Sequence, residues 1–342
     1  MSTAENQLNE YEILNEIGQG SFGIVRRVRH RRTQKVYAWK EVHYAGMSEK
    51  EKTLLVNEVN ILRELHHPNI VRYYDRIVDK HNAKLYIIME YCDGGDLGRV
   101  IRRCREKSVY VDEDVVWKIL AQLSSALKDC HSHTPSKILH RDIKPKNIFL
   151  NKQKIAKLGD FGLSRTLDNG SFAVTTLGTP YYTSPEQIQQ QAYDERSDIW
   201  SLGCVIYELC RLRPPFTGEN RQDLDHKICH APVESIGSHY SQELFSVIKG
   251  MLEKNSSKRI TIDQLCQHPQ IILRLRELKV QNHLIQLQKK EAELVEREKK
   301  IHSKELELRQ KEMLLTQREQ DLRQTFRPEQ SLSRSSSVKA YH

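Results

Sequence analysis

The sequence predicts an α+β fold in which strands come first, helices follow, and one long helix ends the chain. Residues 11–14, 18–25 and 36–42 alternate apolar and polar residues and are separated by turn-forming residues, as in strands. Apolar residues recur at helical spacing in residues 112–133, and the predominantly helical part of the chain continues to about residue 271. From residue 273 onward, one apolar residue recurs at every seventh position, which is typical of a coiled-coil helix.

The composition places the chain among proteins with one sizeable core and an additional solvated segment. The chain has 342 residues, of which 38% are hydrophobic and 29% are charged. Its seven cysteines are scattered without a Cys-x-x-Cys spacing, which favours reduced thiols over disulfides or a zinc site. No signal peptide and no membrane-spanning apolar run is evident, so we expect a soluble cytosolic or nuclear protein with no membrane partner.

The net charge of +9 raises the question of nucleic acid. The arginine-rich residues 26–32 lack the interleaved aromatic residues of single-strand binders. A basic surface that is solvated or faces a substrate is therefore the favoured interpretation, and a nucleic-acid site is the alternative.

A glycine-rich segment, Gly18, Gly20 and Gly23, allows two interpretations. It could be a dinucleotide-binding fingerprint, which needs a helix opening at the third glycine and an acidic residue about 20 residues further on. It could instead be a strand–turn–strand flap over phosphates. Because β-branched and basic residues follow, and Lys40 lies in a second strand 17 residues after Gly23, the sequence favours the flap.

Helices and strands after the flap follow from periodicity. Residues 47–65 are helical in pattern, and they include Glu58, 18 residues after Lys40. Residues 85–89 predict a buried strand, residues 148–150 and 155–158 a hairpin, and residues 112–133 an amphipathic helix capped by Asp112. Asp96 precedes another helix, where it could equally be an N-cap or a ribose contact.

The most informative segment joins His-Arg-Asp at residues 140–142 with Asn147 and with Asp-Phe-Gly at residues 160–162. A chance match of all these residues has odds on the order of one in 10⁹ per starting position. Phosphoryl transfer needs a group that orients and deprotonates the acceptor hydroxyl, and oxygen ligands for Mg²⁺. Asp142 suits the first task, and Asn147 with Asp160 suits the second.

This order and spacing resemble the protein kinases. The resemblance implies a two-lobed fold, with a small β-rich N-lobe and a larger helical C-lobe, followed here by a coiled-coil helix. It implies that Asp142 is the catalytic base and that Lys144 lies near the transferred phosphate, as in kinases with a serine or threonine acceptor. Asn147 and Asp160 would bind Mg²⁺.

The resemblance also implies how ATP is held. Lys40 would hold the α- and β-phosphates and would be paired with Glu58. The expected ATP-contacting residues are Gly18, Gly20, Gly23, Val25, Ala38, Lys40, Met89, Glu90, Cys92, Asp96 and Phe149.

Residues 37–40, 72–74, 90–97 and 178–186, with Gly159, together resemble the NIMA-related kinases. The likeness is strongest to the centrosomal and mitotic members that carry a coiled coil after the kinase domain. It implies protein substrates with Ser or Thr acceptors and a role in the cell cycle, the centrosome or microtubules. The expected locations are the cytoplasm and the cytoskeleton or centrosome, with the nucleus as another, and the expected partners are centrosome or microtubule proteins.

Within this family pattern, two features concern the segment after residue 162. Residues 163–183 are polar and irregular, as in an activation loop. Thr175, Thr176 and Thr179 are the candidate regulatory phosphosites. The resemblance implies a preference for a large apolar residue three positions before the target, which favours Thr175 because Phe172 lies there, whereas Thr179 is expected to contact the catalytic loop. Glu186 is expected to pair with Arg259.

The heptad stripe predicts self-association, with a lone solvated helix as the alternative. A coiled coil buries two rows of each helix, the heptad positions a and d. If the stripe is the d row, the a row after Leu284 consists of glutamates. If the stripe is the a row, the d row includes lysines and arginines. The predicted parts are an N-terminal tail (1–10), a kinase domain (11–271), a coiled coil (272–326) that makes a homodimer, and a disordered Ser-rich basic tail (327–342). The stripe consists of Leu273, Val280, Leu287, Leu294, Ile301, Leu308, Leu315 and Leu322.

Two other function classes compete with an active kinase. A catalytically silent coiled-coil scaffold would need a gap at Lys40, Asp142, Asn147 or Asp160, and all four residues are present. The sequence leaves open a cytoskeletal binding protein with incidental kinase activity.

Overall fold

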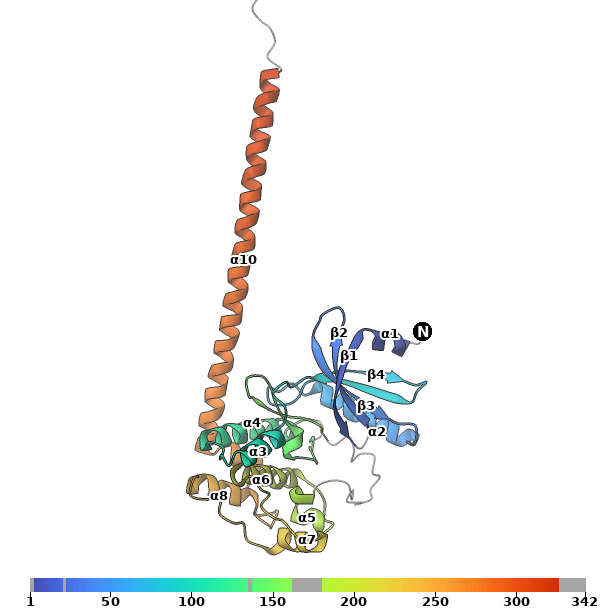
Figure 1. The fold of residues 1–342 in the computed structure, drawn as a ribbon, viewed down its shortest axis with the longest axis vertical. Helices are drawn as coiled ribbons and strands as arrows, with labels where there is room; N and C mark the ends of the chain where they lie inside the picture. The colour runs from blue at the N-terminus through green and yellow to red at the C-terminus, as the bar shows by residue number, and fades with distance from the viewer. Residues whose placement is uncertain (1–2, 21–22, 135–136, 162–179, 326–342) are drawn as a thin grey trace, which may run out of the picture. The chain divides into compact units, whose positions relative to one another are not determined.

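The structure, a computed structural model, describes residues 3–20, 23–134, 137–161 and 180–325 (Figure 1). By their contacts, the residues divide into a first unit, 1–277, and a second unit, 278–342. The first unit has the expected kinase lobes, one of strands and one of helices. No helix in the described ranges is long and apolar enough to span a membrane.

The N-lobe is built on a five-stranded antiparallel sheet with the strand order β1-β2-β3-β5-β4. Because side chains alternate across a strand, β3 sends Ala38 and Val42 into the main core and Trp39 to the other face. Both faces are covered, which explains the uninterrupted burial along β5. The strands are β1 Tyr11–Gly20, β2 Gly23–His30, β3 Val36–His43, β4 Tyr73–Asp79 and β5 Lys84–Glu90.

Two helices accompany this sheet. Helix α2 (Glu49–Glu64) begins after Ser48, whose hydroxyl accepts from the Glu51 backbone N–H while the Glu51 carboxylate accepts from the Ser48 backbone N–H. Helix α1 (Thr3–Asn9) forms within the predicted tail. Its Ala4 and Leu8, one turn apart, pack against the small cluster around Trp39.

The C-lobe consists of helices around one continuous hydrophobic core. Helix α4 (Glu113–His131) is capped by Asp112, as predicted, and α6 (Glu195–Arg211) is buried along nearly all its length. Helix α6 begins at Glu195 because the Asp194 side chain caps its first turn. The remaining helices are α3 Leu97–Glu106, α5 Pro185–Ile188, α7 Arg221–His230, α8 Gln242–Met251 and α9 Ile262–Cys266.

A short hairpin presents the residues of the predicted catalytic segment. It pairs β6 (Ile148–Leu150) with β7 (Ala156–Leu158), as the sequence predicts. The 3-10 helix Pro145–Asn147 precedes β6, and Asp160 follows β7 by two residues.

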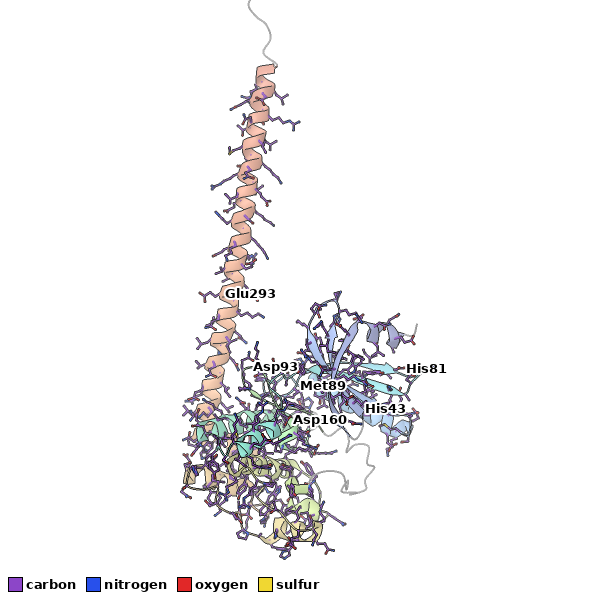
Figure 2. All side chains as sticks on the ribbon, in the orientation of Figure 1. His43, His81, Met89, Asp93, Asp160 and Glu293 are labelled. Carbon is purple, nitrogen blue, oxygen red and sulfur yellow. The ribbon has the colours of Figure 1, made fainter. Side chains whose placement is uncertain are left out.

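The long helix α10 (Pro269–Thr325) supplies most of the second unit's described residues. Its side chains project outward along its length (Figure 2). All eight residues of the heptad stripe are exposed, with exposed fractions between 48% and 63%.

Candidate active site

Asp198 on α6 fixes the backbone of the catalytic loop, residues 140–147. Its carboxylate accepts hydrogen bonds from the backbone N–H groups of His140 and Arg141, each at 3.0 Å. It also accepts from the Tyr193 hydroxyl at 2.5 Å and meets His131 Nε2 at 2.8 Å. Burial by itself would raise the pKa of Asp198, but the hydrogen bond from His131 and the other donors outweigh burial and hold that pKa below its usual value.

Hydrogen bonds join two predicted catalytic residues, Asp142 and Lys144, with the predicted metal ligand Asn147. Lys144 Nζ donates to Asp142 Oδ2 at 2.7 Å. Asn147 Nδ2 donates to the same oxygen at 2.8 Å and to the Asp142 backbone carbonyl at 2.9 Å. The Asp142 carboxylate is therefore held in one orientation, and about a third of its side chain is exposed.

His140 connects the catalytic loop to Asp160. Its Nδ1 accepts from the Asp142 backbone N–H at 3.3 Å, and its Nε2 lies 3.1 Å from the Gly159 carbonyl. Its ring centroid lies 4.5 Å from that of Phe161. Complete burial lowers the pKa of His140. Because Nδ1 accepts from the Asp142 N–H, the ring hydrogen lies on Nε2, which donates to the Gly159 carbonyl.

Lys40, on β3, forms an ion pair with Asp160. Lys40 is 8% exposed, so its ammonium is largely removed from water and directed toward Asp160. The predicted partner Glu58 lies on α2, but its side chain is outside the described part of the structure. The Lys40–Glu58 pair therefore stays a prediction.

A cavity of about 400 Å³, called here the main cavity, brings most of the predicted ATP-contacting residues together. Met89, Asp93 and Asp160 mark its region in Figure 2. Eight of the eleven predicted residues line it: Val25, Ala38, Lys40, Met89, Glu90, Cys92, Asp96 and Phe149.

The three glycines do not line the main cavity but shape the β1–β2 hairpin beside it. Gly18 pairs with Val25, and Gly20 with Gly23. A Cβ atom at Gly23 would overlap the backbone oxygen of Glu41, so only glycine fits there. The glycine pattern thus marks a close approach of two backbones.

Asp96 acts as an N-cap, one of the two roles left open. Its Oδ1 accepts from the Arg99 backbone N–H at 2.8 Å at the start of α3. Because Asp96 also lines the main cavity, the cap does not exclude a ligand contact.

Cys92 also lines the main cavity. Burial and the nearby Glu90 charge raise the pKa of its thiol to about 12. The thiol is therefore protonated at neutral pH, and Cys92 lines the cavity as an apolar side chain.

The sequence reasoning missed several residues of the main cavity. Val71 lies in the segment before β4, and its backbone N–H donates to the Leu158 carbonyl, which places it against the β6–β7 hairpin. Such contacts join distant segments and leave no local sequence signal. The missed lining residues are Asn15, Glu16, Ile17, Val71, Tyr91, Asp93, Gly95 and Arg99.

The predicted pair between Glu186 and Arg259 is confirmed. Arg259 Nη1 and Nη2 donate to the two Glu186 oxygens at 2.7 and 2.8 Å, and both side chains are buried. Thr175, Thr176 and Thr179 lie outside the described residues, so their roles stay predictions.

Comparison with known proteins agrees with this geometry. The protein kinase domain family matches residues 11–271. The chain is 47% identical to "Probable serine/threonine-protein kinase nek2" of Dictyostelium discoideum, over 84% of this chain and 69% of the relative. It is 48% identical to human "Serine/threonine-protein kinase Nek2", over 78% of this chain and 60% of the relative.

A fungal protein kinase is also similar to this chain. The chain is 41% identical to "G2-specific protein kinase nimA" of Emericella nidulans, over 85% of this chain and 45% of the relative. Less than two thirds of the human and fungal relatives is therefore covered. With the fold, the catalytic loop and these similarities together, the chain belongs to the protein kinase family and, within it, to the NIMA-related kinases.

Proposed function

We propose that this chain transfers the γ-phosphoryl group of ATP to serine and threonine hydroxyls of proteins. The observation that carries the proposal is the cluster of Asp142, Lys144 and Asn147. Its neighbour Asp160 lines the main cavity together with Lys40. This arrangement supports the proposal, because it offers candidates for a base, a cation and two metal ligands near a cavity that could hold a nucleotide.

Asp142 is the proposed catalytic base. Its carboxylate would orient the acceptor hydroxyl and take its proton, while Asn147 and Lys144 hold the carboxylate in place. The Lys144 ammonium would stabilise negative charge on the transferred group. Lys40, now paired with Asp160, would bind the phosphates of the nucleotide.

The donor atoms at Asn147 and Asp160 fit Mg²⁺. The Asn147 amide nitrogen faces Asp142, so its carbonyl oxygen points away from that carboxylate. An amide oxygen and a carboxylate are the hard oxygen donors that Mg²⁺ prefers. Bound Mg²⁺ would neutralise charge on the β- and γ-phosphates.

The activity can be tested with γ-labelled ATP, a mixed protein substrate and phosphoamino-acid analysis. We expect label on serine and threonine, and its loss in Lys40→Met. Lys35→Met, which removes an exposed lysine from the turn between β2 and β3, serves as the matched control and should keep the activity. Label mainly on tyrosine, or full activity in Lys40→Met, would contradict the proposal.

We also propose that α10 pairs with the α10 of a second copy of this chain. Eight apolar side chains in one heptad register are exposed on this helix. Ion pairs along the helix, such as Glu296–Lys300, support a lone helix but do not require that stripe. Burial of the stripe gives self-association its free energy.

The charges beside the stripe select a parallel pair. At about 3.5 residues per turn, positions three and four residues after a stripe residue lie on opposite sides of it, each at roughly 51°. In a parallel pair related by a two-fold axis along the helices, the basic row of each copy faces the acidic row of the other. In an antiparallel pair, like charges would face each other. The basic row is Lys290, Arg297, Lys304, Lys311 and Arg318, and the acidic row is Glu291, Glu298, Glu305, Glu312 and Glu319.

Oxidative cross-linking tests this orientation. Val280 lies toward one end of the stripe, and Leu315 lies at the corresponding position toward the other end. A parallel pair predicts that Val280→Cys forms a disulfide-linked dimer, whereas an antiparallel pair would require Val280→Cys together with Leu315→Cys. The unmodified chain, with its seven free cysteines, is the control for background links.

We further propose a role in the cell cycle, in the cytoplasm and at the cytoskeleton or centrosome. The support is the family and the name of the relative "G2-specific protein kinase nimA". Co-pelleting with microtubules tests the alternative of a cytoskeletal binding protein. If Lys40→Ala, which should lack kinase activity, still co-pellets, the binding function does not depend on catalysis.

A further inference from the structure

A second cavity, of about 360 Å³, lies beside the catalytic loop; we call it the α3 cavity. It is enclosed by α3, residues 144–146, Tyr182 and α6, and it shares no lining residue with the main cavity. Lys144 lines it while donating to Asp142 at 2.7 Å. A group in this cavity would therefore lie close to an acceptor held at Asp142.

Several polar groups of the α3 cavity are already engaged. Glu208 is 8% exposed, accepts from the Tyr182 hydroxyl at 2.6 Å and lies 3.9 Å from Arg105 Nη2. Arg105 also donates through Nε to the Leu212 carbonyl at 2.8 Å. Burial raises the pKa of Glu208, which weakens it further as a partner for an incoming cation.

Two lining cations are free by contrast. Arg102, on α3, and Lys146, in the catalytic loop, line the cavity and are exposed. Within the described part of the chain, neither side chain makes an ion pair or a hydrogen bond. Among the described residues that line the α3 cavity, Glu208 is the one acidic side chain, and its carboxylate is engaged. The charge that the described lining offers to a ligand is therefore positive.

We propose that the α3 cavity binds an anionic side chain of the protein substrate, held by Arg102 and Lys146, within a few residues of the acceptor. An extended chain advances about 3.3–3.6 Å per residue, so a neighbouring residue can reach the cavity while the acceptor stays at Asp142. A carboxylate and a phosphate share the required chemistry. The proposal rests on the proposed kinase function and adds a substrate preference to it.

Matched peptides test this preference. One set places Glu, phosphoserine, Lys or Gln at each of the four positions on either side of a single acceptor. At one position or more, we expect Glu or phosphoserine to raise kcat/KM by about fivefold over Gln, mainly through a lower KM. A stronger effect of phosphoserine than of Glu would identify phosphate as the preferred anion, and the reverse would identify carboxylate.

Variants assign the effect to the cavity. Arg102→Gln should reduce the ratio of kcat/KM for the Glu peptide to that for the Gln peptide toward one, while leaving phosphorylation of the Gln peptide unchanged. Lys146→Gln, in the catalytic loop, should reduce the same ratio. Arg103→Gln, one residue along α3, removes an equal charge at an exposed position outside the cavity lining and should keep the preference. Arg102→Glu should shift the preference toward Lys at the same position.

Three results would overturn the proposal. One is a peptide set with no anion preference. Another is a preference that persists in both Gln variants, and a third is a preference of the wild type for Lys, which would make Glu208 the determinant. Phosphorylation of the Gln peptide separates these results from a failure of the kinase function itself.

Discussion

Asp198 shows how one buried residue can set the geometry of a reaction that it does not touch. It accepts from two consecutive backbone N–H groups, at His140 and Arg141, just before Asp142. Arg141 has a φ of 65°, an uncommon conformation for a residue other than glycine. Hydrogen bonds to a fully buried carboxylate are one means of keeping the loop in that conformation.

Asp198→Asn should destabilise the fold and slow catalysis. An amide presents hydrogens where the carboxylate accepted donors, so about 3 kcal/mol of unfolding free energy should be lost, as measured by urea denaturation. Asp194→Asn is the control at the start of the same helix, since asparagine caps helices as well as aspartate does. A stable, fully active Asp198→Asn would contradict the role given to Asp198.

Glu186 supports a prediction about pH. Burial alone would raise its pKa, but the hydrogen bonds and charge of Arg259, with the Ser197 hydroxyl, hold the pKa below its ordinary value of 4.5. Because the folded pKa is the lower one, the stabilisation is complete above about pH 4.5 and is lost as pH falls through the folded value.

The pH dependence of this stabilisation can be measured by urea denaturation of wild type and Glu186→Gln from pH 7 to pH 3. The wild type should be more stable by about 2 kcal/mol at pH 7, and the difference should shrink below pH 4.5. Glu219→Gln, at an exposed acid, is the control and should give little difference at any pH. A difference in unfolding free energy that grows toward acid pH would contradict a lowered pKa at Glu186.

The candidate site residues differ in how visible they are in the sequence. Asp142, Asn147 and Asp160 stand out because they match the kinase motif at short, fixed spacings. Val71 was not, because its place in the main cavity depends on a backbone hydrogen bond to a strand far along the chain. The Asp198 hydrogen bonds were likewise invisible, since they join α6 to residues nearly 60 positions earlier.

At the scale of elements, strong periodicity and capping residues gave reliable predictions. The helix after Asp112 and the β6–β7 hairpin lie where the pattern places them. The short helix α1 was missed because its order comes from packing on the sheet rather than from its own seven residues. Strand β4 has no clear alternation, since a register shift between Tyr73 and Asp75 puts Tyr73 in the main core and Ile77 in the small cluster around Trp39.

The heptad stripe of α10 leads to a prediction about assembly. Ile301, near the middle of the stripe, is 49% exposed in the single chain. Ile301→Pro, which breaks the helix, should convert dimers to monomers, and Ile301→Asp should do so while sparing the helix. Light scattering at micromolar concentration measures the change.

Gln310→Asp is the matched control for Ile301→Asp. It makes an equal charge change on the opposite face of α10, two residues after Leu308. It should leave the dimer intact. A wild type that is monomeric at micromolar concentration would remove the pairing proposal.

At the scale of the whole molecule, pairing through α10 would raise the local concentration of one kinase domain around another. If Thr175 is phosphorylated by a second copy, activation in the dimer should be fast and nearly independent of protein concentration. In Ile301→Asp, the initial activation rate per molecule should rise in proportion to concentration. Phosphosite mapping after incubation with Mg-ATP should find phosphate on Thr175.

Thr175→Ala separates this scheme from others. In this scheme, a phosphate on Thr175 pairs with Arg141 and orders the activation loop. Thr175→Ala cannot form that pair and should therefore activate more slowly than wild type. Phosphate on the wild type at other sites but not at Thr175, or equally fast activation of Thr175→Ala, would count against the scheme.

The central claim, that Asp142 orients and deprotonates a Ser or Thr hydroxyl beside bound ATP, is tested most directly by Asp142→Asn. Asparagine keeps the size of the side chain but accepts a proton poorly. The account predicts that kcat falls by about 10² or more while the affinity for ATP, measured by calorimetry, is unchanged. Near wild-type turnover in Asp142→Asn would contradict it.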